Sequence, residues 1–131
     1  MNALDTNVLV RFLVQDDEKQ AQVVNQLLKE AEKQQQTYYV SNVVVLELMW
    51  VLKAAYDVPR DAIVGAVSEL LSMVTLEFQD QTVVRDFTIS AQNNTYDLSD
   101  LFIGQVAQHA KCETTLTFDK KAAKSSLFNK L

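Results

Sequence analysis

Short β-prone runs alternate with helical patterns along the whole chain, and this alternation limits the folds that are available to it. The runs that read as strands lie at residues 2–4, 38–40, 74–78, 114–118 and 127–131. Apolar residues recur at helical spacing in the stretches between them, and this spacing places Val23, Ile103 and Ala110 on the inner faces of their helices. We expect Ser41 or Asn42 to cap the helix of residues 43–52, and Pro59 to lie near a helix start. Strands that are joined through helices pair in parallel, with helices on both faces of the sheet. The sequence therefore predicts an α/β fold with a mostly parallel sheet.

Composition supports one helix-rich domain. The 131 residues include only two glycines and one proline, which is few for a turn-rich β-sandwich. This length suits a single domain, residues 1–131, and the 48% apolar content argues against disorder. No apolar run approaches the ~20 residues that span a bilayer, and the pattern of the first residues leads us to expect no secretion signal. Because the single cysteine, Cys112, cannot form an internal disulfide, we expect a cytoplasmic protein with no membrane segment.

Charge is distributed unevenly along the chain. The net charge of −5 argues against a protein that binds nucleic acid through its whole surface. Residues 111–131 nevertheless carry five lysines against Glu113 and Asp119, a local balance of +3. This segment is either a solvated surface or a patch that contacts phosphates, and the sequence leaves both interpretations open.

One glutamate, Glu47, interrupts an otherwise apolar helical segment at residues 43–52. A helix that is apolar all round is normally buried, so we expect the Glu47 carboxylate to be buried too. A buried carboxylate is costly unless it is paired or bound to a metal ion. Because no cation lies within one helical turn, its partner is either a distant cation such as Arg11 or a metal ion shared with other acids.

Four further acids lie at the ends of predicted elements. Asp5 and Asp119 each follow a predicted strand, whereas Asp97 and Asp100 begin a predicted helix. Ligands of open α/β sheets bind beyond the carboxyl ends of the strands, so these acids could meet Glu47 at one edge of the sheet. Each of the four also suits a helix N-cap or first turn, and that alternative stays open.

Carboxylates that meet at one site require a cation. Without one they repel each other and raise one another's pKa. Mg²⁺ and Mn²⁺ take such oxygen ligands, whereas the absence of a His/Cys cluster argues against zinc. Bound Mg²⁺ polarises a phosphoryl oxygen and lowers the pKa of a bound water. An acid-only site of this kind fits the hydrolysis of phosphodiesters.

Four segments together carry a resemblance to a known family. They read Leu-Asp-Thr-Asn-Val at residues 4–8, Val-Val-Val-Leu-Glu-Leu-Met-Trp-Val-Leu at 43–52, Tyr-Asp-Leu-Ser-Asp-Leu-Phe-Ile at 96–103 and Leu-Thr-Phe-Asp-Lys-Lys-Ala-Ala at 116–123. In this order and spacing they resemble the PIN domain family, and more narrowly the VapC-type ribonuclease toxins of bacterial toxin–antitoxin pairs. The resemblance implies a three-layer α/β/α sandwich with a central, mostly parallel sheet of four to five strands.

The resemblance also implies roles for single residues. The acids that would surround Mg²⁺ or Mn²⁺ and form the catalytic site are Asp5, Glu47, Asp100 and Asp119. Asp5 and Asp100 would be the most direct metal ligands, and the other two would complete the site through water or a second metal ion. Asp97 would be an auxiliary acid, while Asn7 and Thr117 would orient the acids or a water molecule.

The activity implied by the resemblance is metal-dependent endoribonuclease cleavage by the toxin of a type II toxin–antitoxin pair. Such proteins usually form homodimers, are blocked by a cognate antitoxin, and in several cases cut structured RNA such as tRNA. One alternative is a non-catalytic module of the same fold that binds RNA or protein. A phospho-receiver signalling domain is a second alternative, although it would need an acid pair after the first strand, where Thr6 and Asn7 follow Asp5.

Other residues carry weaker predictions. The lysines that follow Asp119 would hold RNA phosphates beside the acids: Lys120, Lys121 and Lys124. Weaker candidates for that role are Arg11, Lys53 and Arg60. We expect His109 to be a surface or interface residue and not a general base, Trp50 to belong to the core, and Cys112 to be a small buried thiol.

Overall fold

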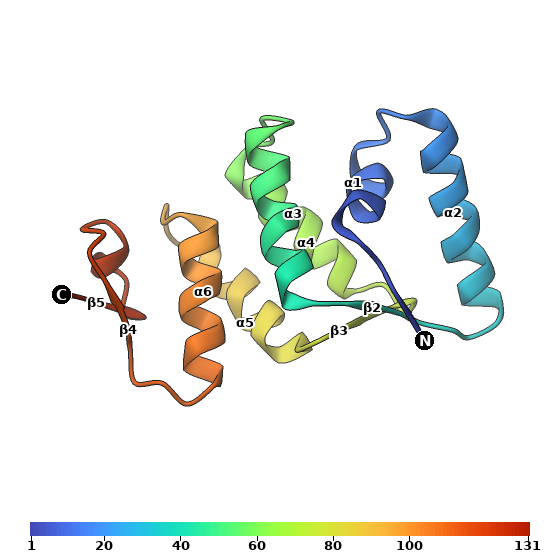
Figure 1. Ribbon diagram of the computed structural model, residues 1–131. Coiled ribbons are helices and arrows are strands. Elements are labelled where there is room, and N and C mark those ends of the chain that lie inside the picture. Colours follow the sequence, from blue (N-terminus) through green and yellow to red (C-terminus); the bar gives the residue numbers. More distant parts are fainter. The chain divides into compact units, whose positions relative to one another are not determined.

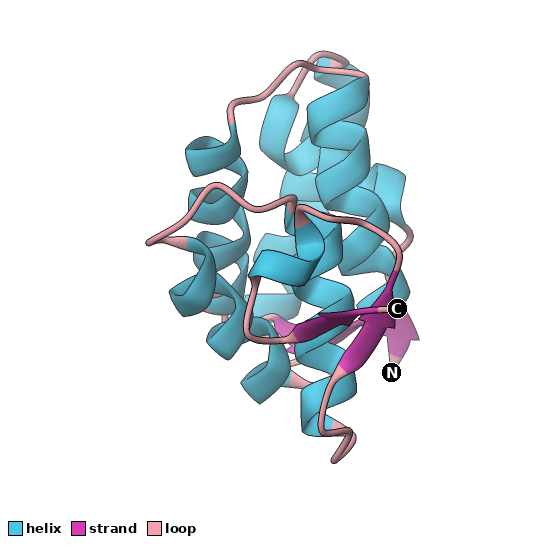
Figure 2. Ribbon diagram, turned by 90° about the vertical axis from the view of Figure 1, so that its left-hand side faces the viewer, coloured by secondary structure: helices cyan, strands magenta, loops and turns pink.

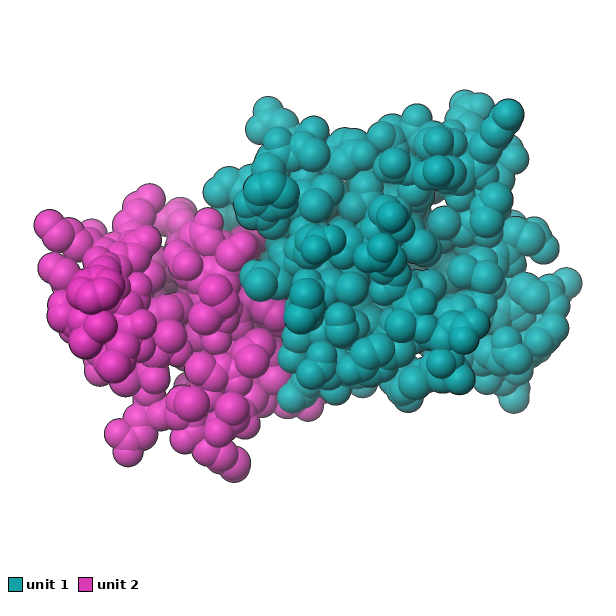
Figure 3. All heavy atoms as spheres, in the orientation of Figure 1, with its two compact units in different colours: residues 1–81 teal, residues 82–131 magenta.

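The computed structural model describes residues 1–131 and contains six α-helices, one 3-10 helix and five strands (Figure 1). Every strand pair is parallel, and helices make up most of the chain (Figure 2). The predicted mixed α/β class with parallel sheets is therefore confirmed. The chain divides into two compact units, Met1–Gln81 and Thr82–Leu131 (Figure 3), and each unit is described by itself below. The assignment of residues 1–131 to a single domain stays a prediction.

Unit 1 contains a parallel sheet of three strands, β1 (Asn2–Ala3), β2 (Tyr38–Val40) and β3 (Leu76–Phe78), in the order β1-β2-β3. Tyr38 is the partner of both Asn2 and Leu76, so the three strands start at the same level. The Leu4 N–H donates to the Tyr39 carbonyl at 2.9 Å, which extends the pairing to the residue before Asp5. The carboxyl ends of β1 and β2 thus lie at the same edge of this sheet.

Four helices accompany this sheet: α1 (Thr6–Val14), α2 (Glu18–Lys33), α3 (Asn42–Ala54) and α4 (Arg60–Leu71). Helix α1 packs against α2 and α3, and α3 also packs against α4. Their buried side chains are mostly apolar and recur at helical spacing, as in Ile63, Val67 and Leu70 of α4. Helix α3 begins where it was predicted, because the Ser41 hydroxyl caps it by accepting a hydrogen bond from the Val44 N–H at 3.2 Å.

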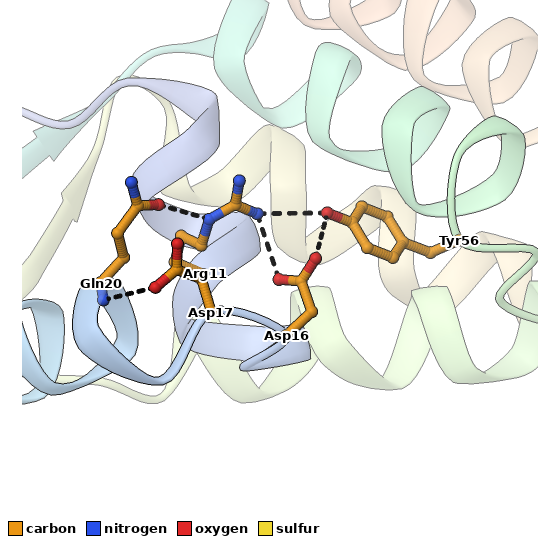
Figure 4. A network of polar contacts seen from close by, with 5 residues as sticks. All are labelled: Arg11, Asp16, Asp17, Gln20 and Tyr56. Atoms are coloured by element: carbon orange, nitrogen blue, oxygen red, sulfur yellow. Dashed lines mark hydrogen bonds and ion pairs between the residues drawn. The ribbon is translucent and has the colours of Figure 1, made fainter.

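A polar network links Arg11 of α1 to the start of α2 and to Tyr56 in the turn after α3 (Figure 4). The Arg11 guanidinium donates to Asp16 Oδ1 at 3.2 Å, to Tyr56 Oη at 3.1 Å and to Gln20 Oε1 at 2.5 Å. The Tyr56 hydroxyl in turn donates to Asp16 Oδ2 at 3.0 Å, and Asp17 caps α2. The hydrogen bond with Tyr56, followed by the charges of Asp16 and Asp17, raises the pKa of Arg11 above its ordinary value. Arg11 is therefore committed to this network.

Unit 2 contains α5 (Gln81–Ala91) except for its first residue, α6 (Leu98–His109), β4 (Thr115–Thr117), the 3-10 helix η1 (Ala122–Lys124) and β5 (Phe128–Lys130). Strands β4 and β5 pair in parallel as a separate two-stranded sheet. Helices α5 and α6 meet through Phe87 and Phe102, whose ring centroids lie 5.3 Å apart with the planes at 85°. His109 Nε2 lies 2.9 Å from Asp86 Oδ2, so the predicted surface or interface histidine joins the same two helices.

The inner face of α6 differs from the predicted one. Ile103 and Ala110, which were expected to face the core, are exposed, whereas Leu98, Phe102 and Gln105 are buried. The buried face of α6 includes a glutamine, Gln105. A prediction from apolar residues alone therefore places the buried face of this helix one residue away from its actual position. A similar shift affects α2, where Val23 is exposed.

Close packing of α6 predicts opposite effects of alanine at the two glycines. A Cβ at Gly104 would lie 2.8 Å from Phe128 Cε2 and 3.0 Å from Leu127 Cβ, whereas a Cβ at Gly65 in α4 meets no atom within 4 Å. We expect Gly104→Ala to lower the free energy of unfolding by up to about 2 kcal/mol, because overpacking outweighs the gain in helix propensity. Gly65→Ala should raise it by about 0.5–1 kcal/mol. Urea denaturation of both variants measures the difference, and equal stabilisation of both would contradict the close approach.

Candidate active site

Asp5 lies where the sequence predicted it, directly after β1 and at the start of α1. The side chain is exposed, and its Oδ1 accepts a hydrogen bond from the Thr6 N–H at 2.7 Å. The side chain of a regular N-cap residue accepts a hydrogen bond from the second or third N–H of its helix. The Asp5 carboxylate instead accepts from the first N–H of α1, that of Thr6. Asp5 therefore caps α1 and leaves Oδ2 without a hydrogen bond, available to a cation.

The predicted burial of Glu47 is wrong, because its side chain is exposed. Helix α3 buries only one face, formed by Val45, Leu48, Met49 and Leu52. The opposite face carries Val43, which is 70% exposed, Glu47 and Trp50, which is 62% exposed. Trp50 is therefore not part of the core, as had been expected. Because exposed positions of α3 are also apolar, its sequence resembles that of a helix buried on all sides. Residue type alone could not distinguish a helix with one buried face from a fully buried helix.

Arg11, one of the two partners predicted for Glu47, does not bind it. Arg11 bonds to Asp16, Gln20 and Tyr56, and Glu47 makes no hydrogen bond or ion pair. Glu47 therefore needs no partner for its charge, since water solvates the exposed carboxylate. What remains is an unpartnered, solvent-facing acid in the middle of a helix, where capping cannot account for it.

Asp97 and Asp100 occupy the first turn of α6 in unit 2. The Asp97 side chain caps the helix, since its Oδ1 accepts a hydrogen bond from the Asp100 N–H at 3.1 Å. The capping interpretation of Asp97 is thus confirmed, while Asp100 does not act as a cap. Asp100 is half-buried at the third helical position, between the buried residues Leu98 and Leu101.

Asp119 follows β4 and is held firmly by its neighbours. Its N–H donates to the Thr117 hydroxyl at 3.0 Å, and its Oδ1 accepts from the N–H groups of Lys121 at 2.8 Å and Ala122 at 3.0 Å. Thr117 therefore orients the backbone of this acid, which is the kind of role the resemblance implied. Two backbone donors fix one carboxylate oxygen, and Oδ2 of Asp119 has no hydrogen bond, which leaves it available to another ligand.

Two of the candidate acids of unit 2 act on the third, Asp100. Burial raises the pKa of Asp100 above its ordinary value, and the negative charges of Asp97 and Asp119 raise it further. The end of β4 and the start of α6 thus bring three predicted site residues within electrostatic range. A cation bound among them would relieve this repulsion, and carboxylate oxygens are the donors that Mg²⁺ and Mn²⁺ prefer.

The donor chemistry therefore fits a divalent cation, but a complete ligand set is not assembled. No group of three or more His, Cys, Asp or Glu side chains is placed to hold a metal ion. Asp5 and Glu47 belong to unit 1, and Asp100 and Asp119 belong to unit 2. The four-acid site as a whole stays a prediction, and so does the role of Asn7, which lines a groove of about 400 Å³ beside α1 and α2.

The cationic residues that the sequence predicted at the site differ in exposure and in partners. The predicted phosphate-binding lysines are all exposed: Lys120, Lys121 and Lys124. The weaker candidates are already engaged, since Arg11 lies in its network and Lys53 and Arg60 also have partners. Cys112 is exposed, which corrects its assignment as a buried thiol. Phe118, 80% exposed and adjacent to Asp119, was missed, although the alternation of residues 114–118 placed it on the same face as Leu116.

Comparison with known proteins identifies the family. The family model described as PIN domain matches residues 3–126, a span that includes all five acids. No curated protein and no solved structure matches the chain. No helix has both the length and the apolar character needed to cross a membrane. PIN domains are generally nucleases and typically use divalent metal ions. Because the match covers nearly the whole sequence, this chain belongs to the PIN domain family.

Proposed function

We propose that this protein is an Mg²⁺- or Mn²⁺-dependent endoribonuclease that hydrolyses RNA phosphodiester bonds. The observation that carries the proposal is the position of Asp100 near Asp97 and Asp119, where burial first, and then the charges of these two acids, raise the pKa of Asp100. Acids that are kept close at a cost in electrostatic energy mark functional sites more often than structural ones. Membership of a family of nucleases gives the class of reaction.

The residues divide the chemistry among them. A bound divalent cation would polarise the phosphoryl oxygen and lower the pKa of a water nucleophile. Asp5 and Asp100 would hold it directly, since one oxygen of Asp5 is free and Asp100 gains most from a neighbouring positive charge. Glu47 and Asp119 would orient water at the site through their free oxygens. The exposed lysines after Asp119 would offset the repulsion between these acids and the RNA backbone.

The biological role that fits these features is the toxin of a type II toxin–antitoxin pair of the VapC type, working in the cytoplasm. Its partners would be an RNA substrate, a second copy of the chain and an antitoxin that blocks the acids. Val43 and Trp50 support a protein partner, because exposed apolar side chains on one helix face, tryptophan above all, are typical of interfaces. An antitoxin segment on this face would cover Glu47, which lies between them.

One observation favours a second candidate, a non-catalytic PIN-fold module that binds RNA or protein. No three acidic side chains are placed to hold a metal ion. A chain that keeps the fold without binding the cation would retain the lysines and lose turnover. Calorimetric titration separates the two candidates, because the module should show no heat of binding at millimolar Mg²⁺.

Cleavage of RNA by the purified protein tests the proposed function. With Mg²⁺ or Mn²⁺ we expect internal cleavage of total or transfer RNA, and with a chelator we expect none, because the acids alone provide no strong nucleophile. Gel electrophoresis of end-labelled RNA measures both. Re-addition of the metal to the chelated sample controls for loss of protein. Cleavage that persists in excess chelator would contradict metal dependence, and the absence of both cleavage and Mg²⁺ binding would favour the binding module.

A further inference from the structure

A polar hollow lies in unit 2 between α5, α6 and the residues that precede β5. Its volume of about 680 Å³ is in the range of small-ligand sites. Helix α6 lines it with Leu101, Gln105 and Gln108, which share one face of the helix because they follow one another at intervals of four and three residues. Leu101 directly follows Asp100, so the hollow begins at the turn of α6 that carries this candidate acid.

Gln105 carries an amide at a buried position of α6. Its side chain is only 6% exposed, whereas glutamine is mostly exposed in proteins. Its Nε2 donates to Gln108 Oε1 at 3.0 Å, and its own Oε1 accepts no hydrogen bond. The buried side-chain atoms that lack a partner are Asn42 Oδ1 and Thr115 Oγ1, so Gln105 Oε1 is accessible from the hollow that this residue lines. The pair therefore presents a free carbonyl oxygen on Gln105 and a free NH₂ group on Gln108.

The remaining lining of the hollow restricts the kind of ligand that it can hold. No lysine or arginine lines it, and its one acid, Asp86, is bonded to His109 Nε2 at 2.9 Å, so a phosphate group finds no cation there. Its aliphatic side chains are Ile89, Leu101 and Leu127. An amphipathic helix would need a broader apolar groove, and an extended peptide would need a strand edge. The lining therefore suits a neutral group that carries both hydrogen-bond donors and acceptors.

Among the parts of an RNA substrate, a nucleobase is such a group, and the lining favours adenine. A glutamine amide binds adenine because its oxygen accepts from the exocyclic amino group while its NH₂ donates to a ring nitrogen. Guanine is usually bound by arginine or lysine, and the hollow has neither. Cytosine is usually bound by an acid, and the acid of the hollow is already bonded to His109.

We propose that the hollow binds an adenine base of the RNA substrate, with Gln105 and Gln108 bonded to the edge of that base. The inference rests on the proposed function and adds a preferred base. Gln105 lies five residues after Asp100, about 7.5 Å farther along α6, so the bound adenine belongs to a nucleotide near the bond that is cut. The candidate acids act on the phosphodiester, which is the same in every nucleotide, so a base preference must come from other side chains.

Cleavage of a random-sequence RNA pool with Mg²⁺, followed by sequencing of the new ends, tests the proposal. We expect adenine at one fixed position near the cut to be preferred over the other bases by roughly 5- to 150-fold, the range for one bidentate contact to a base. A defined oligoribonucleotide with purine in place of that adenine lacks only the exocyclic amino group. Its kcat/KM should fall to the value for the other bases, because Gln105 Oε1 then has no donor to accept from.

Two variants assign the preference to the hollow. Gln108→Ala changes an exposed side chain, and Gln105→Leu replaces the buried amide by an apolar side chain of similar size. Both should lose the preference for adenine, and thermal unfolding shows whether each remains folded. Gln92→Ala is the matched control, since Gln92 is an exposed glutamine of unit 2 that does not line the hollow, and it should keep both the rate and the preference.

The outcomes separate this inference from the proposed function. Cleavage without a base preference, or with a preference for another base, would overturn the adenine contact and leave the nuclease activity standing. An adenine preference that persists in both folded variants would overturn the assignment to Gln105 and Gln108. Loss of the preference in Gln92→Ala as well would also overturn that assignment. Failure of the unsubstituted protein to cleave any RNA with Mg²⁺ would overturn the proposed function, and the inference with it.

Discussion

Asparagine at Asp5 or Asp100 is expected to abolish metal-dependent RNA cleavage without unfolding the protein. Each substitution removes one negative charge and one strong oxygen donor from the proposed ligand set while keeping the shape of the side chain. We expect cleavage to fall by at least roughly 10²–10³-fold, which is the loss caused by removing one strong electrostatic contact to a transition state. Single-turnover cleavage of end-labelled RNA at saturating Mg²⁺ gives this ratio for each variant.

A control and a stability measurement accompany this experiment. Asp61 is an exposed acid in the first turn of α4, a position like that of Asp100 in α6, and Asp61→Asn should cleave at the normal rate. Asp100→Asn should unfold at the same or a higher temperature than the unsubstituted protein when metal is absent. Normal cleavage by both Asp5→Asn and Asp100→Asn would reject the proposed site, and a large loss of stability would assign Asp100 a structural role.

The effect of Asp100 on stability should depend on pH in a defined direction. Burial and the charges of Asp97 and Asp119 raise its pKa in the folded state, so the folded protein holds this proton more tightly than the unfolded chain does. That contribution is fully present below the ordinary carboxyl pKa and is lost as pH rises through the raised value. The stability advantage of Asp100→Asn over the unsubstituted protein should therefore grow from acidic to neutral pH and shrink when Mg²⁺ is added.

Glutamine at Glu47 is expected to reduce cleavage while leaving stability unchanged. The carboxylate is exposed and makes no hydrogen bond or ion pair, so its replacement should change the free energy of unfolding by less than about 0.5 kcal/mol. If Glu47 orients a metal-bound water, cleavage should fall by roughly 10- to 100-fold, as is usual when a residue that positions a metal ligand is lost. Urea denaturation and cleavage kinetics on the same preparation measure the two effects.

Glu69→Gln is the matched control for this experiment, because Glu69 is an exposed glutamate on α4 of the same unit. It should change neither stability nor cleavage. Cleavage at the normal rate by Glu47→Gln would remove Glu47 from the catalytic residues. A loss of stability in Glu47→Gln alone would instead indicate that Glu47 supports the packing of α3.

The positions of the elements followed from the sequence because local signals mark their ends. Ser41 caps α3 as predicted, Pro59 precedes α4, and β2 occupies the predicted residues 38–40. Which face of a helix is buried was less predictable, because it depends on what packs against that helix. The side chains of Glu47 and Ile103 were therefore predicted to be buried, whereas both are exposed. Apolar residues are common on protein surfaces, so an apolar residue alone does not locate the core.

The candidate site was predictable where it depends on neighbours in sequence. The cap at Asp97 and the contact between Thr117 and Asp119 both span no more than three residues. The hydrogen bond from Arg11 to Tyr56, 45 residues away, could not be predicted from the spacing of residues in the sequence, because it depends on how α1 and α3 pack. The exposure of Phe118 had a local signal in the alternation of its strand, but only burial measured in three dimensions showed it.

Backbone N–H groups at helix starts and turns already hold three of the proposed site acids in place. Asp5, Asp97 and Asp119 each accept such hydrogen bonds, which also offset part of the negative charge. The protein itself thus supplies a partial substitute for a cation. An incoming ion meets donors whose positions are largely preset, but it gains less than it would from fully uncompensated carboxylates. Such a site suits an ion that exchanges readily with the surrounding solution, and nuclease activity would then follow the free concentration of that ion.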